Sequence, residues 1–457
     1  MINYNKYYFL GIGGIGMSAL ARYFNLKGFQ VGGYDRTETK LTIDLQSEGI
    51  AVSFDEQIAA IPNQFLDPKQ TLIVLTPAIP ENHLQLNYFK SNGYNILKRA
   101  ELLGNITRQS KGICIAGTHG KTTTSTITAH LLYQSQVGCN AFLGGISNNY
   151  NTNLLLSKES NLVVIEADEY DRSFHQLSPF MSVITSVDAD HLDIYDSAEA
   201  FRESFEHFAS LILPGGALII KKGLDIKPKL QKGVKTYTYS MDNGGDFHAE
   251  NIRIAKGEIM FDFVTPTNTI ADIKLGVPIL INVENSVAAM ALAWLNGVSK
   301  EEIRMGISSF SGIYRRFNVV YKSEKVVYMD DYAHHPSELN ASISSIRALY
   351  PGRKITGIFQ PHLYTRTRDF ADDFSKSLSK LDELILLDIY PARELPIEGV
   401  NSELILNKVT LENKTICTKE QLPDLLSERE LDIVVTFGAG DIDKMVPIIK
   451  NLLKQKS

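Results

Sequence analysis

The sequence of 457 residues has few cysteines and no excess of positive charge. Its three cysteines, Cys114, Cys139 and Cys417, are widely separated and form no CxxC pair, so neither a disulfide framework nor a structural zinc site is indicated. The formal net charge of -6 argues against a broad nucleic-acid-binding surface. No run approaches the roughly eighteen unbroken apolar residues of a membrane span. These absences predict a cytoplasmic protein that binds neither nucleic acid nor membrane.

The length and composition predict several globular domains. Hydrophobic residues make up 44% of the chain and charged residues 21%, as in ordinary globular proteins. At about 150 residues per domain, the chain suggests roughly three domains. We predict an α/β protein with an N-terminal Rossmann-like domain at 1–106, a central P-loop ATPase domain with a mixed sheet at 107–312, and a C-terminal Rossmann-like, doubly wound domain at 313–457.

A glycine-flanked turn follows the apolar residues 113–116. It reads Gly117-Thr118-His119-Gly120-Lys121-Thr122 and precedes a predicted helix. Such a turn offers backbone N–H groups, a helix N-terminus and an ammonium group to a polyphosphate. Only two residues separate its glycines, where the general Walker pattern has four, which indicates a narrower family. The motif predicts a nucleoside triphosphate site, with an ordinary strand–turn–helix corner as the alternative.

A second glycine-rich turn stands near the N-terminus. Gly11-Ile12-Gly13-Gly14-Ile15-Gly16 lies between the predicted strand 7–10 and a predicted helix, and Asp35 closes the next apolar stretch, where a ribose-binding acid would stand. The pattern predicts a nucleotide site and is compatible with NAD, FAD or a UDP-type nucleotide. Farther along, Arg99 opens a predicted helix, and its side chain is either a surface charge or a phosphate contact.

Acidic residues follow two apolar strands of the central region. Residues 162–165 lead to Glu166-Ala167-Asp168-Glu169, and residues 182–187 lead to Asp188-Ala189-Asp190-His191. Crowded carboxylates are stabilised by a hard cation such as Mg2+, which accompanies triphosphates, although a solvated acidic loop is the alternative. Residues 234–280 alternate in the β manner, and we expect them to add antiparallel strands beside the sheet.

The C-terminal region repeats one pattern four times. Apolar strands at 326–329, 355–359, 384–387 and 433–437 each end in polar, turn-forming residues, with helix-length segments between them. This pattern predicts a doubly wound parallel sheet with its functional residues at one edge. The His and Arg residues at that edge jointly indicate a site for an anionic substrate.

Taken together, these motifs resemble the Mur ligases, and the resemblance covers nearly the whole chain. The resemblance rests on the motifs Gly117-Thr118-His119-Gly120-Lys121-Thr122, Glu166-Ala167-Asp168-Glu169, Asp190-His191, Asn282 with Asn285, Arg315-Arg316-Phe317, Asp331-Tyr332-Ala333-His334-His335-Pro336 and Gly438-Ala439-Gly440-Asp441.

The resemblance implies three domains that bind a UDP-sugar, ATP and an amino acid, in that order. It implies that ATP, with Mg2+, phosphorylates the lactoyl carboxylate of UDP-N-acetylmuramate, and that the amine of L-alanine then displaces phosphate from the acyl phosphate. ADP and phosphate are the other products, and the reaction serves peptidoglycan synthesis. We expect a monomer or a weak homodimer.

The resemblance also assigns residues to the three substrates. The residues expected at ATP are Gly117, Thr118, Gly120, Lys121, Thr122, Thr123, Asn285, Arg316 and Asp331. Those expected at the UDP-sugar are Gly11, Gly13, Gly14, Ile15, Gly16, Asp35, Thr76, Arg99, His119 and Glu169. The amino acid would contact Tyr332, His334, His362 and Arg366; magnesium would bind Thr122, Glu166 and His191; and the catalytic residues would be Lys121, Glu166, His191 and His334.

Other functions are also compatible with parts of the sequence. A recycling ligase that joins an intact tripeptide to the same UDP-sugar shares most motifs of the family. An NAD-dependent dehydrogenase explains the N-terminal glycines but gives Lys121 no role, and a guanine-nucleotide switch lacks its NKxD loop. Three positions depart from the family pattern: Ile281 stands where many members carry His, Leu363 replaces an Arg expected in some relatives, and Ser186 stands where Asn is common.

Overall fold

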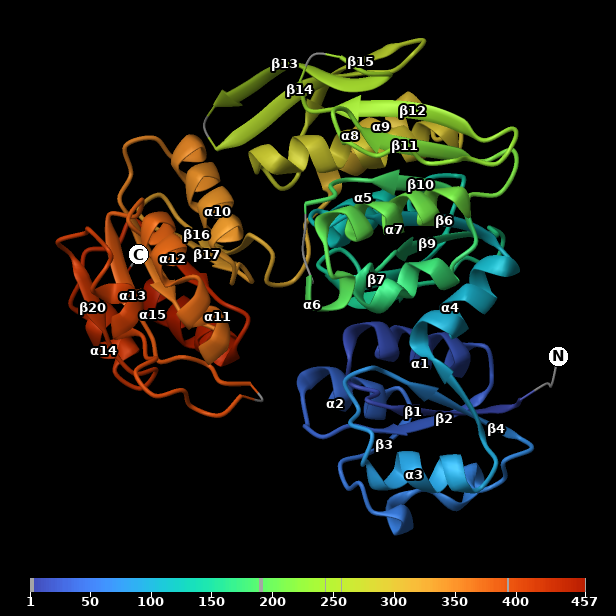
Figure 1. The fold of residues 1–457 in the computed structure, drawn as a ribbon. Coiled ribbons are helices and arrows are strands. Elements are labelled where there is room, and N and C mark those ends of the chain that lie inside the picture. The colour runs from blue at the N-terminus through green and yellow to red at the C-terminus, as the bar shows by residue number, and fades with distance from the viewer. Residues whose placement is uncertain (1–3, 189–191, 243, 256, 393, 457) are drawn as a thin grey trace. The chain divides into compact units, whose positions relative to one another are not determined.

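The computed structural model describes residues 4–188, 192–242, 244–255, 257–392 and 394–456. These residues form three β-sheets, of five, ten and six strands, with helices connecting many of the strands (Figure 1). The chain divides into two compact units. The first comprises Met1–Glu250, Asp262–Ile273 and Glu284–Phe310, and the second comprises Asn251–Phe261, Lys274–Val283 and Ser311–Ser457.

The N-terminal sheet is parallel throughout, with strand order β3-β2-β1-β4-β5. The strand predicted at 7–10 is confirmed as β1. The strands are β1 (Lys6–Leu10), β2 (Gln30–Tyr34), β3 (Ala51–Ser53), β4 (Thr71–Leu75) and β5 (Asn95–Lys98), with helices α1 (Ile15–Leu26), α2 (Lys40–Ser47), α3 (Leu84–Ser91) and α4 (Arg99–Arg108) and the short 3-10 turns η1 (Ile58–Ala60) and η2 (Asn63–Phe65).

The central sheet is mixed, with strand order β15-β14-β13-β12-β11-β10-β6-β9-β7-β8. Its strands are β6 (Lys111–Ala116), β7 (Asn140–Ser147), β8 (Thr152–Leu155), β9 (Leu162–Glu166), β10 (Pro179–Ile184), β11 (Ala217–Lys221), β12 (Lys235–Ser240), β13 (Phe247–Ala255), β14 (Glu258–Val264) and β15 (Thr269–Lys274). The helical elements are α5 (Lys121–Tyr133), η3 (Tyr170–Gln176), α6 (Leu192–Tyr195), α7 (Ala198–Ser210), α8 (Leu280–Leu295) and α9 (Lys300–Ser309).

One expectation for the central sheet is wrong for β12. The strands at 234–280 were expected to be antiparallel additions, but β12 pairs in parallel with both β11 and β13. The β12–β13 pairing covers only Tyr239 with Phe247 and Ser240 with His248, because β13 leads away from the end of β12 and does not fold back along it. In the same sheet, β7 and β8 pair in antiparallel orientation.

The C-terminal sheet has strand order β16-β17-β21-β18-β19-β20. It is parallel except for the antiparallel edge pair β16–β17, and the four predicted strands are confirmed as β17, β18, β19 and β21. The strands are β16 (Asn318–Lys322), β17 (Val327–Asp331), β18 (Ile355–Phe359), β19 (Glu383–Leu386), β20 (Lys414–Ile416) and β21 (Ile433–Phe437), with α10 (Pro336–Leu349), α11 (Tyr364–Asp369), α12 (Ala371–Leu378), α13 (Glu403–Leu406), α14 (Leu422–Ser427), η4 (Asp441–Met445) and α15 (Val446–Lys456).

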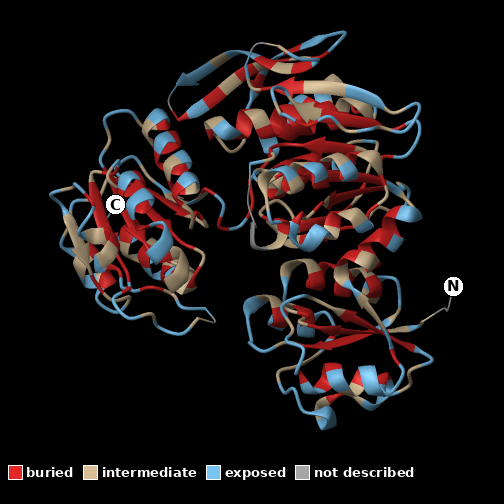
Figure 2. Ribbon diagram, viewed as in Figure 1, coloured by how far each residue is buried: buried red, intermediate tan, exposed pale blue. Residues whose placement is uncertain are grey.

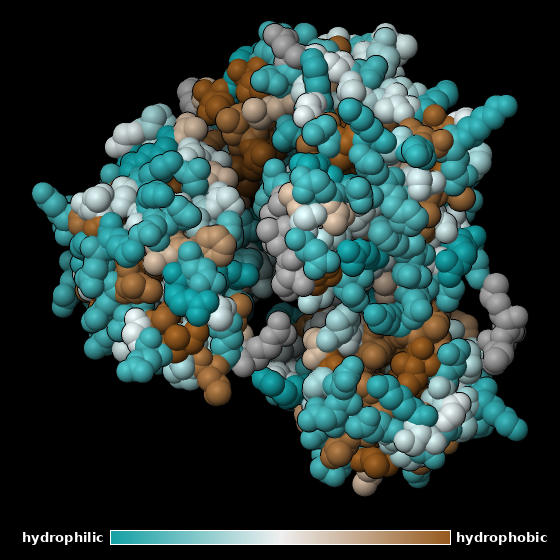
Figure 3. Space-filling view, viewed as in Figure 1, coloured by the Kyte–Doolittle hydropathy of each residue, from teal (hydrophilic) through white to brown (hydrophobic). Residues whose placement is uncertain are grey.

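Buried strands form the centre of each sheet, and helices present mixed buried and exposed faces (Figure 2). β18 and β21 are buried along their whole length, which is the pattern of parallel strands covered on both faces. The viewed surface carries mainly hydrophilic side chains with smaller apolar areas (Figure 3). Among the described residues, none of the helices is both long and apolar enough to cross a membrane.

Candidate functional site

The phosphate loop connects β6 to α5. Gly117 and Gly120 have φ values of +136° and +82°, a backbone region that side chains disfavour. A Cβ at Gly117 would lie 2.0 Å from Thr185 Oγ1, so the close approach also requires glycine. Neighbouring strand ends hold the loop, because the His119 backbone N–H donates to Ser186 Oγ at 2.8 Å. The loop is therefore held in place by the residues that follow β10.

The Lys121 side chain lies folded against this loop. Its Nζ donates to the Gly117 carbonyl at 2.6 Å and to Glu169 Oε1 at 2.7 Å. Burial raises the pKa of the Glu169 carboxyl, although the Lys121 ammonium opposes that shift. Glu169 Oε2 is buried and has no hydrogen-bond partner among the described residues. A phosphate oxygen entering the loop would replace Glu169 as the partner of the ammonium.

The oxygen ligands predicted for magnesium meet at the start of α5. Thr122 donates its hydroxyl hydrogen to Glu166 Oε1 at 3.1 Å. Gly144 of β7 faces this carboxylate so closely that a Cβ there would lie 1.8 Å from Glu166 Oε2. A hydroxyl and a carboxylate suit a hard cation such as Mg2+. The third predicted ligand, His191, lies outside the described residues.

Asn285 of α8 also reaches the phosphate loop. Its Oδ1 accepts from Thr124 Oγ1 at 3.3 Å, and a Cβ at Gly120 would lie 2.8 Å from the same oxygen. Asn285 therefore lies at Gly120 of the phosphate loop, which also contains Gly117, Thr118, Lys121, Thr122 and Thr123, whereas Arg316 and Asp331 belong to the second compact unit.

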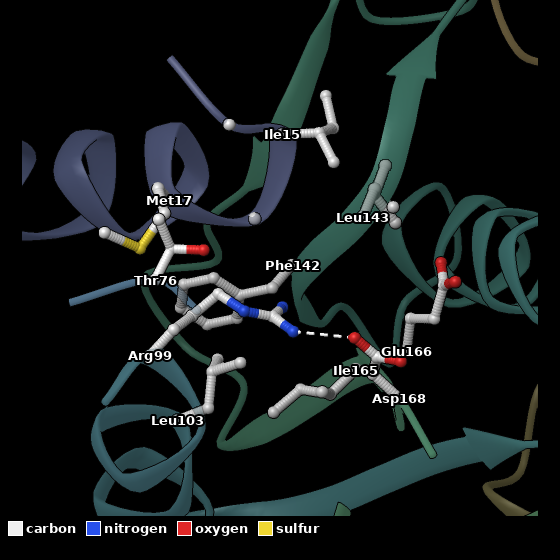
Figure 4. A pocket seen from close by; sticks show the side chains of 13 residues that line it. Ile15, Met17, Thr76, Arg99, Leu103, Phe142, Leu143, Ile165, Glu166 and Asp168 are labelled. Carbon is white, nitrogen blue, oxygen red and sulfur yellow. Dashed lines mark hydrogen bonds and ion pairs between the residues drawn. The ribbon is translucent and has the colours of Figure 1, made fainter. Parts of the chain in front are cut away.

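A cavity of about 270 Å³ lies between the N-terminal sheet domain and the central sheet, within the first unit (Figure 4). The first turn of α1 lines one side, and Glu166 lies on the other. Arg99 extends into the space between them and forms an ion pair with Asp168, at 2.9 Å between Nη2 and Oδ2. The full lining is Gly14, Ile15, Gly16, Met17, Thr76, Arg99, Leu103, Phe142, Leu143, Gly144, Ile165, Glu166 and Asp168.

Glycines of the N-terminal turn permit close contacts with the residues predicted beside them. Gly13 N–H donates to Asp35 Oδ2 at 2.8 Å, which places the predicted ribose-binding acid at the turn. A Cβ at Gly16 would lie 2.7 Å from Arg99 Nη1, and one at Gly11 would lie 2.5 Å from the Thr76 methyl group. Among the described residues, five of the ten predicted for the UDP-sugar line the cavity: Gly14, Ile15, Gly16, Thr76 and Arg99.

The remaining five lie elsewhere. Gly11, Gly13 and Asp35 are in or beside the glycine turn. His119 is half exposed in the phosphate loop, with Nε2 3.7 Å from Asp188 Oδ2. Glu169 is paired with Lys121, on the phosphate side.

The second unit collects the residues predicted for the amino acid. His334 Nδ1 lies 2.9 Å from the Tyr332 carbonyl oxygen. Because a carbonyl only accepts, Nδ1 carries the hydrogen and the lone pair of the neutral ring is on Nε2. Burial lowers the pKa of His334, an effect that the Glu338 carboxylate opposes, and burial therefore favours the neutral ring. The His334 and His362 rings have centroids 5.8 Å apart, and Arg366 Nη1 lies 3.4 Å from His362 Nδ1.

Leu363, one of the positions that depart from the expected family pattern, has a backbone φ of +72° directly before α11. Its N–H donates to the Tyr390 carbonyl at 2.9 Å, so the unusual conformation is fixed by a neighbouring segment. Positive φ is uncommon for a bulky residue, and such positions concentrate at functional sites.

The sequence interpretation missed two residues that organise these sites. Gly144 is needed for the approach of Glu166, and a glycine within an apolar strand was the signal that could have found it. Arg315 is 9% exposed and donates to the carbonyls of Gly440 at 3.2 Å and Gly438 at 2.6 Å. It thereby fixes the start of the C-terminal domain to the loop after β21, whereas the sequence analysis gave it no role beyond its place in the Arg315-Arg316-Phe317 motif.

The fold and the site together define a class of protein. Glu166 bonds to Thr122 of a lysine-bearing phosphate loop on a mixed sheet and also lines a cavity formed with a separate glycine turn on a parallel sheet. This combination is typical of a multidomain enzyme that brings a nucleoside triphosphate to a second nucleotide-linked substrate. Models of three domains match the chain: the Mur ligase family catalytic domain at 6–111, the Mur ligase middle domain at 115–293 and the Mur ligase glutamate ligase domain at 315–440. The chain belongs to the Mur ligase family.

Individual relatives match along the whole chain. The UDP-N-acetylmuramate–L-alanine ligase of Parabacteroides distasonis is 59% identical over 446 residues, covering 98% of this chain and 96% of the relative. The enzyme of the same name from Cytophaga hutchinsonii is 45% identical, covering 98% and 97%. The crystal structure of the UDP-N-acetylmuramate-alanine ligase of Thermotoga maritima has the same fold, with a TM-score of 0.83 at 24% identity, covering 99% of this chain and 100% of that one.

Proposed function

We propose that this protein is an ATP-dependent ligase that joins L-alanine to UDP-N-acetylmuramate in the synthesis of peptidoglycan precursors. Relatives that carry this activity in their names are up to 59% identical over nearly the whole chain. The structural observation that supports the proposal most strongly is the position of Glu166. It accepts from Thr122 of the phosphate loop and also lines the cavity of the glycine turn, so the two substrates would meet at one carboxylate.

The reaction proceeds in two displacements. An oxygen of the lactoyl carboxylate attacks the terminal phosphorus of ATP, ADP leaves, and an acyl phosphate forms. The amine of L-alanine then attacks the acyl carbon, inorganic phosphate leaves, and the amine loses a proton. The protein contributes by holding the reacting groups together and by neutralising charge on the transferring phosphate.

Residues of the phosphate loop would carry the first displacement. Backbone N–H groups between Gly117 and Lys121 would receive phosphate oxygens, and the Lys121 ammonium would exchange Glu169 for the transferring phosphate. Magnesium, held by Thr122 and Glu166, would neutralise part of the triphosphate charge. Arg99 and the first turn of α1 would bind the anionic part of the UDP-sugar.

Residues of the C-terminal domain would carry the second displacement. The neutral imidazole of His334 would accept the alanine proton on Nε2. Arg366 would bind the alanine carboxylate, with His362 and Tyr332 around the same site. Under this proposal the domains at 1–106, 107–312 and 313–457 bind the UDP-sugar, ATP and the amino acid, and the protein acts as a monomer or a weak homodimer.

Phosphate release from ATP tests the proposal directly. The assay contains UDP-N-acetylmuramate, MgCl2 and, in turn, L-alanine, glycine, L-serine or an intact tripeptide as acceptor. We expect release to be fastest with L-alanine. Release with none of these acceptors would refute the ligase, and release with the tripeptide alone would identify a recycling ligase.

A further inference from the structure

Asn153, on the edge strand β8 of the central sheet, binds α1 of the N-terminal domain. Its side chain is fully buried. Oδ1 accepts from Arg22 Nη1 at 2.5 Å, while Nδ2 donates to the Ile15 carbonyl at 2.6 Å and to Ser18 Oγ at 2.9 Å. Because Arg22 can only donate and a carbonyl can only accept, the orientation of the amide is fixed. All three partners belong to α1, which packs between its own sheet and β7 and β8 (Figure 1).

The charge of Arg22 is compensated within the N-terminal domain. Its Nε donates to Glu48 Oε2 at 2.8 Å, and Nη2 donates to Glu48 Oε1 at 2.7 Å. Glu48 therefore uses one edge of the guanidinium group, and Nη1 is left to face Asn153. With Arg22 at 6% exposure, the contact between the domains is a buried polar network with specific geometry.

The bond from Asn153 acts on the part of α1 that faces the cavity. The Ile15 carbonyl shares its peptide unit with the Gly16 N–H, and both residues line the cavity. Ser18 Oγ also donates to this carbonyl, at 2.9 Å. Two side-chain donors on one carbonyl fix the plane of the peptide and increase its polarisation, which strengthens the N–H as a donor. The N-cap residue Gly14 provides no side-chain cap, so this end of the helix is open to an anion.

We propose that Asn153 is a positioning residue for the UDP-sugar. From the ATP-binding domain it fixes the Ile15–Gly16 peptide of the glycine turn, so that the turn is held for the diphosphate at a set distance from Glu166 and the phosphate loop. The proposal rests on the proposed function, because it assumes that the cavity receives the UDP-sugar.

Asn153→Asp separates this role from general stability. The carboxylate keeps an acceptor for Arg22 but cannot donate to the Ile15 carbonyl, which it repels. We expect the KM for UDP-N-acetylmuramate to rise about tenfold or more, while the KM for ATP changes less than about twofold. An unchanged KM for the UDP-sugar, or an equal rise in both constants, would overturn the proposal.

Asn140→Asp is the matched control. Asn140 begins β7 and donates to the Ser160 and Leu162 carbonyls at 3.0 and 3.2 Å, so its replacement removes similar bonds inside the central domain without touching α1. We expect it to leave the KM for the UDP-sugar unchanged. An equal effect of both variants would mean that Asn153 is only structural.

Two further measurements keep the test decisive. If Asn153→Asp does not fold, Ser18→Ala removes the second donor to the same carbonyl and should raise the KM for the UDP-sugar severalfold; no rise would overturn the proposal. Calorimetric titration with UDP alone measures the affinity of the glycine turn for UDP without turnover. Asn153→Asp should lower this affinity about tenfold, and unchanged UDP binding would overturn the proposal. If the unaltered protein binds UDP but releases no phosphate with any acceptor, the proposed function fails while the role of Asn153 is still measured.

Discussion

Lys121 and Glu169 form a buried ion pair at the phosphate loop, with 2.7 Å between Nζ and Oε1 and side chains that are only 13% and 3% exposed. The Tyr195 hydroxyl donates to the Glu169 backbone carbonyl, which ties the residue to α6. The ammonium proposed to bind the triphosphate is therefore already paired with a carboxylate, and under the proposed function the phosphate would exchange with that carboxylate.

Glu169→Gln tests this exchange. Glutamine keeps an acceptor for Lys121 but removes the competing charge, so we expect the KM for ATP to fall severalfold while the KM for UDP-N-acetylmuramate stays the same. Steady-state phosphate release gives both constants. A rise in the UDP-sugar constant would instead support a direct contact between Glu169 and the sugar. Glu159→Gln, at an exposed position of the same domain, is the control.

Glu166→Ala should remove most magnesium-dependent turnover and leave UDP-sugar affinity nearly unchanged, because the carboxylate is one of the two oxygen ligands proposed for magnesium among the described residues. Gly144→Ala should act similarly without removing the ligand, since its Cβ would overlap Glu166 Oε2. We expect the half-saturating magnesium concentration to rise about tenfold in a titration of activity. Equal losses of turnover and UDP-sugar affinity would mean that the acidic segment is structural.

His334→Gln should lower kcat by about 10²-fold or more and abolish the acid limb of the pH profile. Because burial lowers the pKa of His334, the limb of the unaltered enzyme should lie below the ordinary imidazole value of 6.5. His335→Asn is the matched control, since asparagine preserves the helix cap that His335 provides to α10. A pH profile that is unchanged in His334→Gln would indicate that solvent accepts the alanine proton.

Ionisation of Asp330 should make the free energy of unfolding fall as pH rises. Burial raises its pKa from 3.8 to about 6, although Thr436 donates to its Oδ1 at 2.7 Å. Between these values the folded state binds more protons than the unfolded state, so the stabilisation is complete below pH 3.8 and is lost as pH rises through 6. The unfolding free energy lost in this way is on the order of 3 kcal/mol, because a difference of one pKa unit between the folded and unfolded states corresponds to about 1.4 kcal/mol.

Asp330→Asn should remove that slope, because the amide can still accept from Thr436 and does not ionise. Thermal unfolding of both proteins at pH 4.5, 5.5 and 6.5 measures the difference. We expect the variant to gain stability relative to the unaltered protein across this interval. A constant difference would show that Asp330 is already ionised at the lower pH.

The sequence by itself determined the strands, the loops and the chemistry of each motif. Apolar runs that end in Gly117, Glu166 or Asp331 predicted parallel strands with functional residues at their carboxyl ends, because that pattern depends only on local residue order. The spacing from Gly117 to Thr122 likewise predicted a triphosphate loop, since the residues involved lie within one turn.

Only the tertiary structure decided which distant residues meet. The pairing of Lys121 with Glu169, the need for Gly144 beside Glu166 and the bond from Asn153 to Ile15 all join segments that are far apart in the chain. The parallel course of β12 also depends on where the chain turns after Ser240, which strand alternation does not encode. Periodicity shows which face of a strand is buried, whereas its partners are set by packing of the whole domain.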